Sequence, residues 1–386
     1  MIAYNQQQLD NLSINEAAEQ ALYKNCITQD EYNQVLTAHP VTLYMPNAFI
    51  RIGLFLLTIV IALVSFGLFC LLFLSSGTEA YGGLTLFVGL CAYAMLEFMI
   101  RDKKHFCSGV DDALMWISGI LIISSILIFT SFEISSLSIC LLITVIATFF
   151  AVRFADSIMG LVAFLAFLGA IFYGCLYIGV AGKVVAPFLL MTASFGVYLV
   201  ARNISHTPAA RHYKHSLNLL MIASLITTYL AVNYFVVRET SDAMFNLQLN
   251  PQDSIPAAWL FWIFTVAIPL LYIYLGIRKK DRILLCTGLI LIAAICFTIR
   301  YYHHIAPLEV VMILGGAFMI GIAYAVTRYL RTPRHGFTSE AADELHREAL
   351  QLESLIIAQT MSQVQPDNSF KFGEGSGGGA GASGEF

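Results

Sequence analysis

Two sets of residues in this sequence have types and spacing that suit chemistry. The first lies in RYYHHIAPLE, residues 300–309, where Arg300, His303, His304 and Glu309 stand close together between two apolar segments. Such side chains can bind an anion, a proton or a metal ion. Adjacent histidines share one metal only where the chain bends, because neighbouring side chains on a regular helix point in different directions. The alternative is an anchoring belt at a membrane surface, with the two tyrosines of the segment among the lipid headgroups.

The second set comprises three carboxylates at the edges of apolar segments, Glu97, Asp111 and Asp112. A charge inside lipid costs on the order of 2.5–3.5 kcal/mol, so acids beside membrane-spanning segments are candidate functional groups. Glu97 stands four residues before Arg101, which is the favourable order for an ion pair on a helix. Asn233 is the clearest polar side chain within an apolar segment, and we expect it to bond a neighbouring helix.

Motifs of membrane-embedded enzymes are not found in the sequence. The segment MTASFG lacks the GxSG pattern of a serine hydrolase, and neither HExxH nor CxxC occurs. An H-x-x-H pair in HTPAARHYKHS is flanked by Arg211 and Lys214, which would repel a bound cation, so we interpret this segment as a solvated basic loop. The sequence therefore predicts no enzymatic activity, no cofactor and no metal site.

The composition indicates that membrane-spanning helices hold these residues in place. Of 386 residues, 58% are hydrophobic and only 12% are charged, and the mean hydropathy is +0.74. One soluble core cannot bury that much apolar surface, so we expect a polytopic membrane protein whose main partner is the lipid bilayer. The formal charge of −4 argues against nucleic acid as a partner, because a protein that binds phosphates needs a basic face.

Ten apolar segments are long enough to cross a bilayer as helices of roughly 20 residues. They predict an all-α, polytopic integral membrane bundle of about ten transmembrane helices. We place these spans near residues 52–74, 82–100, 113–131, 134–152, 158–180, 185–201, 217–237, 257–277, 283–299 and 308–330.

The basic residues indicate the orientation of these spans. Lys and Arg near the ends of spans are retained in the cytoplasm, and fifteen of them fall in one alternate set of connections, against three in the other set. The even number of spans then places both termini in the cytoplasm. It also places residues 300–309 in an external connection, where they could line a vestibule.

The polar segment at residues 1–48 predicts a small cytoplasmic helical hairpin. Two patterns typical of capping boxes occur in it, Ser13 with Glu16 and Thr28 with Glu31. Asn25 is suited to end the first helix. The hairpin either binds a protein partner or packs only on itself or on the membrane domain, residues 49–331.

The C-terminal part predicts two further segments. Residues 332–364 have apolar side chains at three- and four-residue steps, which indicates an amphipathic helix that lies on the membrane or pairs with a copy of itself. Residues 365–386 are glycine-rich and predict a disordered tail. A protein partner or self-association through the cytoplasmic ends is therefore expected.

Two stretches carry a resemblance to a known group of proteins. These are ALYKNCITQDEYNQVL in the predicted hairpin and RYYHHIAPLEVVMILGGAFMIGIAYAV near the last span. The chain resembles the bacterial membrane proteins grouped as domain of unknown function 2157, and its last span is similar to the related group 4401. The resemblance covers the first 75 residues and residues 300–330 best. It implies a bacterial inner-membrane protein and supplies no catalytic residues.

Two functions from different classes remain open. The first is a non-enzymatic protein that acts in binding, scaffolding or envelope sensing through its cytoplasmic ends. The alternative is a small-solute transporter built from five spans plus five in inverted orientation. A transporter requires a cavity near the middle of the bilayer that is lined from both halves, whereas a scaffold is packed shut.

Overall fold

The structure is a computed structural model that describes residues 2–72, 77–245 and 255–302, together with isolated positions between 313 and 328. The chain divides into two compact units, Met1–Ile305 and Ala306–Phe386. The second unit falls almost entirely outside the described residues, so the fold below is that of the first unit. Every regular element in the described ranges is a helix, apart from one isolated bridge between Tyr44 and His105.

Two short helices begin the chain, α1 (Gln6–Tyr23) and α2 (Gln29–Ala38). The predicted capping box at Thr28 and Glu31 is present at the start of α2. The predicted box at Ser13 is wrong, because α1 already begins at Gln6 with Asn5 as its cap, and the Ser13 hydroxyl instead donates to Asp10 O (2.8 Å). Asn25 ends α1 in the left-handed conformation, with φ of 55°.

Eight helices in the described part of the chain are long and apolar enough to cross a membrane. The chain is thus a multi-pass membrane protein with a helical bundle. The eight are α3 (Ala48–Leu72), α4 (Thr78–Arg101), α5 (Val110–Phe129), α6 (Ser136–Phe154), α7 (Ser157–Tyr177), α8 (Val180–Ser205), α11 (Ala258–Lys279) and α12 (Arg282–Tyr302). The predicted span at 308–330 lies outside the described residues, apart from the isolated positions.

The predicted seventh span, residues 217–237, is not one continuous helix. After η1 (Pro208–Tyr213), it consists of α9 (Lys214–Leu230) and α10 (Tyr234–Phe245), which meet at an angle of 67°. The break is stabilised by side chains that replace helical hydrogen bonds: Asn233 Oδ1 accepts from Phe235 N (3.0 Å), and Tyr234 N donates to Thr265 Oγ1 (2.9 Å). Asn233 Nδ2 also donates to Thr298 Oγ1 of α12 (3.2 Å), which confirms the expected bond to a neighbouring helix.

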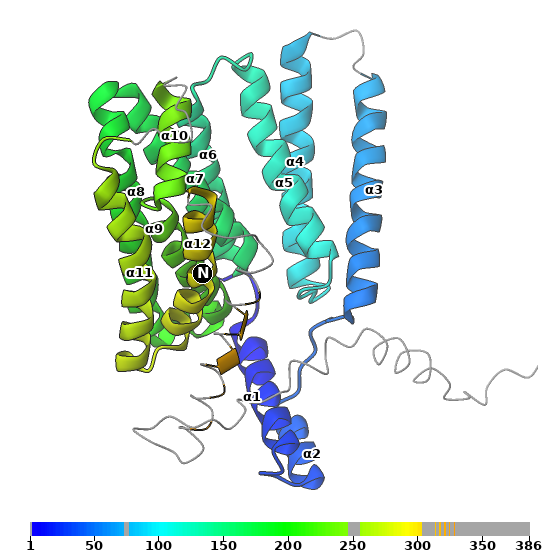
Figure 1. The fold of residues 1–386 in the computed structure, drawn as a ribbon. Coiled ribbons are helices and arrows are strands. Elements are labelled where there is room, and N and C mark those ends of the chain that lie inside the picture. Colours follow the sequence, from blue (N-terminus) through cyan, green and yellow to red (C-terminus); the bar gives the residue numbers. More distant parts are fainter. Residues whose placement is uncertain are drawn as a thin grey trace, which may run out of the picture. The chain divides into compact units, whose positions relative to one another are not determined.

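The helix ends rich in arginine and lysine gather at one end of the bundle, which we call the basic end. Three contacts between connections that are distant in sequence show this: Arg51 with Asp112, Arg202 with Asp281, and Ser157 with Ser216. In Figure 1, α1 and α2 lie at the end where α3 begins and α4 ends. The connections from α5 to α6 and from α7 to α8 lie at the opposite end.

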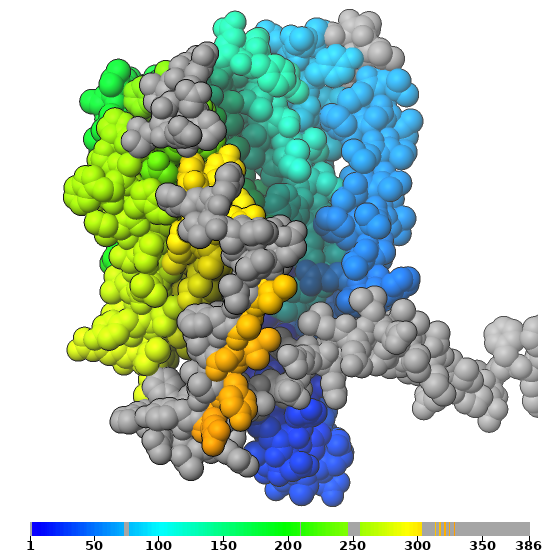
Figure 2. Space-filling view, in the orientation of Figure 1, coloured from blue at the N-terminus to red at the C-terminus, as the bar shows by residue number. Residues whose placement is uncertain are grey.

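The closest packing joins α4 to α5, α6 to α7, α8 to α9 and α11 to α12, whereas α3 stands at the edge of the bundle. None of the side chains of α3 is buried, and Figure 2 shows this helix along one side of the molecule. The hairpin of α11 and α12 is tight because Gly288 has no side chain: a Cβ there would lie 3.0 Å from Ile273 N. Small residues at such crossings allow helices in membranes to pack closely.

Candidate functional site: the cavity at the basic end

The site starts from the first turn of α5, which holds two of the three predicted acids. Gly109 precedes this helix with φ of +88°, and a Cβ at this position would lie 2.1 Å from Arg51 O. Only glycine therefore allows α3 to approach the start of α5 so closely. Asp111 and Asp112 follow in the first turn, where the helix dipole favours negative charge.

Asp111 is a buried carboxylate, with 3% of its surface exposed. Its Oδ1 accepts hydrogen bonds from Ser108 N (2.9 Å) and Ser108 Oγ (3.0 Å), and its Oδ2 lies 3.5 Å from the Tyr4 hydroxyl, which donates to it. The N-terminal segment thus reaches the edge of the membrane domain. Burial, followed by the charge of Asp111, raises the pKa of Tyr4 well above its ordinary value, so this hydroxyl keeps its proton.

Asp112 joins α5 to α3. Its Oδ2 accepts from Arg51 Nε (2.9 Å) and Arg51 Nη2 (2.7 Å). The pair is partly buried, and charge-assisted bonds of this kind are shorter and stronger than neutral ones. Sequence reasoning treated Arg51 as an orientation signal and did not pair it with Asp112.

Glu97 lies at the centre of a cluster that joins α4 to α6. The predicted pair with Arg101 is present at 3.1 Å, and Tyr93 OH donates to Oε1 (2.9 Å). The more buried partner is Arg153 of α6, whose Nε and Nη2 donate to Oε1 (2.9 Å) and Oε2 (3.0 Å). Sequence reasoning missed this pair because 56 residues separate the two side chains. Glu97 acts here as a structural anchor.

The N-terminal segment is attached to the basic end at further points. Ala3 N donates to Arg153 O (2.8 Å), which links it to the end of α6. Asp10 of α1 pairs with Arg211 of η1 (2.6 Å) and lies 3.4 Å from His212 Nε2. The segment interpreted as a solvated basic loop is therefore also the place where α1 is held.

A cavity of ≈ 710 Å³ lies between the N-terminal segment and the ends of the spans. Small-molecule sites have similar volumes, about 300–1,000 Å³. Charged and titratable side chains of both signs line it. The acids are Glu16, Asp111, Asp112 and Asp156, and the potential cations are Arg51, Arg211, His212, Lys214 and His215.

Cys107 is the thiol in the wall of this cavity. Burial is the largest influence on it and raises its pKa to about 11; Asp112 and Asp111 act in the same direction, against an opposing effect of Arg51. A thiol with that pKa is almost entirely neutral near pH 7 and is a poor nucleophile. The chemistry that the cavity supports is therefore ionic and hydrogen-bonded recognition.

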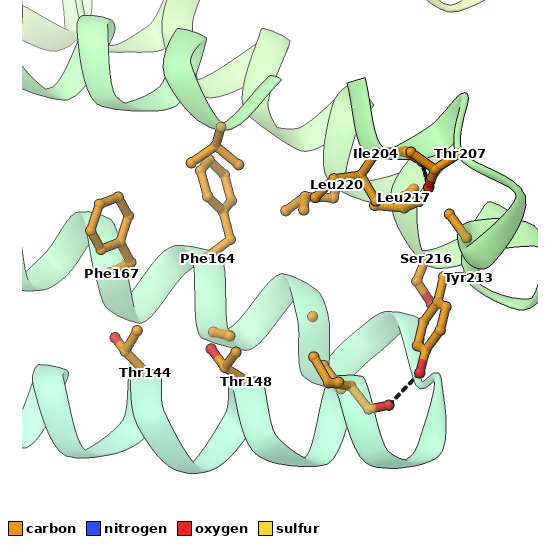
Figure 3. A pocket seen from close by; sticks show the side chains of 16 residues that line it. Thr144, Thr148, Phe164, Phe167, Ile204, Thr207, Tyr213, Ser216, Leu217 and Leu220 are labelled. Atoms are coloured by element: carbon orange, nitrogen blue, oxygen red, sulfur yellow. Dashed lines mark hydrogen bonds between the residues drawn. The ribbon is translucent and has the colours of Figure 1, made fainter. Parts of the chain in front are cut away.

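A second cavity, of ≈ 490 Å³, is an apolar groove bordered by α6, α7, α8 and α9. We call it the apolar groove. Figure 3 shows Phe164 and Phe167 of α7 on one side of it and Leu217 and Leu220 of α9 on another. Tyr213 closes its basic end, where its hydroxyl donates to Val152 O (2.7 Å).

The predicted external cluster is described only in part. Arg300 lies in the last turn of α12 at the opposite end of the bundle, whereas His303, His304 and Glu309 lie outside the described residues. The tyrosines that follow Arg300 enter an aromatic cluster: Tyr301 and Tyr302 pack against Phe235, Tyr234 and Trp262, among others.

Arg238 is a buried cation of that aromatic cluster which sequence reasoning missed. Its side chain lies 5.1 Å from the centre of the Tyr302 ring and 3.3 Å from Glu239 Oε1. In the sequence it is one of the three basic residues in the second set of connections, and in the structure only 5% of its surface is exposed. The signal available in the sequence was an isolated arginine directly after an apolar segment that contains aromatic residues.

The fold and the cavities define a multi-pass helical membrane protein with an ionic cavity at one end. Among the described residues, no group of three His, Cys, Asp or Glu side chains is placed to hold a metal ion. In the comparisons with known proteins, no family model, no curated protein and no solved structure matches this chain.

Proposed function

We propose that this chain is a non-enzymatic membrane protein that binds a small charged molecule in the cavity at its basic end and senses it through the N-terminal helices. One observation carries the proposal: the cavity is enclosed by α1 on one side and by the ends of several spans on the other. A molecule bound there contacts both parts. Binding of the molecule therefore changes the stability of the contacts that Asp10, Tyr4 and Ala3 make between the N-terminal segment and the membrane domain.

The charges in the cavity favour a ligand with an ammonium group. Arg51 is neutralised by Asp112, and Arg211 is neutralised by Asp10. The remaining acids of the wall, Glu16, Asp111 and Asp156, then face Lys214 as the remaining permanent cation of that wall. The excess of negative charge attracts a small organic cation. The hydroxyls of Tyr4 and Ser13 donate to Asp111 and to Asp10 O, and their oxygens can still accept from its ammonium group.

The orientation of this site follows from the positive-inside rule. The cationic connections lie at the basic end, so this end faces the cytoplasm and the N-terminus is cytoplasmic. With the predicted span at 308–330, the C-terminus lies on the same side. The resemblance to domain of unknown function 2157 supports placement in a bacterial inner membrane.

Binding is testable with two small probes of opposite charge and similar length, 1,4-diaminobutane and succinate. We expect isothermal titration of the purified chain to detect the diamine and not succinate. The substitution Glu16→Gln in the cavity wall removes about 1 kcal/mol of electrostatic attraction. We expect it to weaken the affinity for the diamine about fivefold. Glu19→Gln is the matched control, because Glu19 is exposed on the same helix and does not line the cavity.

Two results would contradict the proposal. Binding of succinate in place of the diamine would show that the sign of the site is wrong. Equal weakening by Glu16→Gln and Glu19→Gln would show a general surface effect, because only one of these residues borders the cavity.

The second candidate is the small-solute transporter, and the broken span favours it. Discontinuous helices near the middle of the membrane are a recurring feature of transporters. The apolar groove is also lined by α6 and α7 from the predicted first half and by α8 and α9 from the second. Uptake of radiolabelled 1,4-diaminobutane into liposomes that contain the protein would support transport, whereas binding without uptake supports the sensor.

A further inference from the structure

We propose that the apolar groove between α6, α7, α8 and α9 binds one acyl chain of an anionic phospholipid from the leaflet at the basic end. This site is separate from the ionic cavity and does not depend on the proposed function.

The groove exists because small side chains line two of its walls. Gly160 and Ala163 on α7 and Ala151 on α6 leave space that the rings of Phe164 and Phe167 border (Figure 3). Tyr213 closes the basic end through its bond to Val152 O. Thr148, Val152 and Ile204 line the groove and are exposed, so it opens sideways toward the lipid.

The depth of the groove matches one leaflet. Its lining on α6 runs from Thr144 to Val152, which is about 12 Å of helix at 1.5 Å per residue. Half of the bilayer core is about 15 Å thick. A membrane-spanning helix of a second copy would need a groove of about 30 Å, so the apolar groove is too short for that occupant.

The groove offers few free polar groups to a solute. Four hydroxyls that line it already donate to backbone carbonyls of the protein. They are those of Thr144 to Cys140 O (2.7 Å), Thr207 to Ile204 O (2.7 Å), Tyr213 to Val152 O (2.7 Å) and Ser216 to Ala155 O (2.9 Å). An occupant therefore gains apolar contact and little hydrogen bonding, which suits a hydrocarbon chain.

The charges at the basic end select the headgroup. Each element that lines the groove on α6, α8, η1 and α9 has a basic residue there. Arg153, Arg202 and Arg211 pair with acids of other elements, which leaves Lys214 as the cation for a headgroup. Asp156 at the start of α7 is the one acid among the basic-end residues of these elements. A lysine near a membrane surface attracts an anionic lipid by about 1 kcal/mol, which is about fivefold in affinity, so a phosphate-bearing anionic headgroup is favoured over a zwitterionic one.

The test compares lipid retention by native mass spectrometry. The full chain is mixed with phosphatidylglycerol, phosphatidylcholine or glycerol 3-phosphate, the last of which supplies the headgroup chemistry without an acyl chain. We expect retention of one phosphatidylglycerol, about fivefold weaker retention of phosphatidylcholine, and none of glycerol 3-phosphate.

Variants that fill the groove locate the site. Gly160→Leu places a side chain in the groove, and we expect it to weaken the retention of phosphatidylglycerol at least tenfold. Gly196→Leu is the matched control, because Gly196 has open space around it on α8 and does not line the groove. Thr148→Trp, which fills the groove from its exposed rim on α6, provides a second variant, with Val145→Trp on the exposed face of the same helix as its control.

The proposal is overturned if both filling variants retain phosphatidylglycerol like their controls. It is also overturned if glycerol 3-phosphate binds as well as the lipid, because recognition would then reside in the headgroup alone. A lipid-free dimer that dissociates in Thr148→Trp but not in Val145→Trp would assign the groove to a second copy and would likewise overturn it.

Discussion

Arg153 of α6 and Glu97 of α4 form a forked ion pair, with Nε and Nη2 of the arginine at 2.9 and 3.0 Å from the two carboxylate oxygens. Both helices approach the basic end here, and the backbone carbonyl of Arg153 accepts from Ala3 N. One arginine thus joins two spans and the N-terminal segment. This arrangement explains why a carboxylate is tolerated near the edge of the bilayer.

Removing one partner of this pair should destabilise the bundle. We expect Glu97→Gln to lower the free energy of unfolding by about 1–3 kcal/mol, because it removes the carboxylate that accepts two charge-assisted hydrogen bonds from the partly buried Arg153. Arg101→Gln should cost less than about 1 kcal/mol, because Arg101 is largely exposed and its pair is screened. Unfolding in mixed micelles measures both. A larger effect of the Arg101 variant would contradict the assignment of Arg153 as the main partner.

The break between α9 and α10 should depend on Asn233. Asn233→Leu removes the cap of α10 together with the bond to Thr298, and we expect a loss of about 1–3 kcal/mol. Asn233→Asp keeps an acceptor for the cap and loses the donor, so it separates the two contributions. If both variants unfold like the parent in micelles, the polar network does not stabilise the break.

The sequence predicts most of this architecture because membrane insertion depends on length and apolarity, which are local properties. Eight predicted spans match helices in the described ranges, and the acids at 111 and 112 fall in the first turn of α5. The break in the seventh span was not predicted, because it is stabilised by Thr265 and Thr298, which lie on other helices. The pattern of apolar residues along the sequence does not predict contacts between side chains of different helices.

The site was predictable only as isolated residues. Asp111 and Asp112 were recognised, but their partners Tyr4 and Arg51 lie 107 and 61 residues away. The positive-inside rule already explained why arginines lie near the ends of the spans. Their ion pairs with distant acids were therefore not predicted. The false cap at Ser13 has a different cause: S-x-x-E also occurs inside helices, and Asn5 provided an earlier start.

The thiol of Cys107 should react slowly and with a steep dependence on pH. Because its pKa is about 11, only about one thiol in a thousand is ionised at pH 8, and alkylation should accelerate about tenfold per pH unit up to that pKa. The raised pKa also means that the folded protein loses stability as pH rises from about 9 toward 11, since the unfolded thiol ionises first. Mass spectrometry of iodoacetamide adducts follows the rate. Rapid alkylation at pH 7 under native conditions would contradict the raised pKa of Cys107.

Gly109→Ala should separate α3 from the start of α5. The added Cβ would lie 2.1 Å from Arg51 O, and φ of +88° is unfavourable for alanine, so the backbone must shift. We expect loss of the Arg51–Asp112 pair and a marked fall in thermal stability. Gly83→Ala is the control, because Gly83 has open space around it on α4. Equal stability of the two variants would show that α3 does not depend on this approach.

The orientation of the bundle can be tested at two exposed positions that lie at opposite ends. Asp102 follows α4 at the basic end, and Tyr177 ends α7 at the other. In a background without native cysteines, Tyr177→Cys should react with a membrane-impermeant maleimide added to intact cells, because the end that is poor in Lys and Arg is translocated. Asp102→Cys should react only after lysis. The reverse pattern would place the ionic cavity, the N-terminal helices and the apolar groove at the outer face of the membrane.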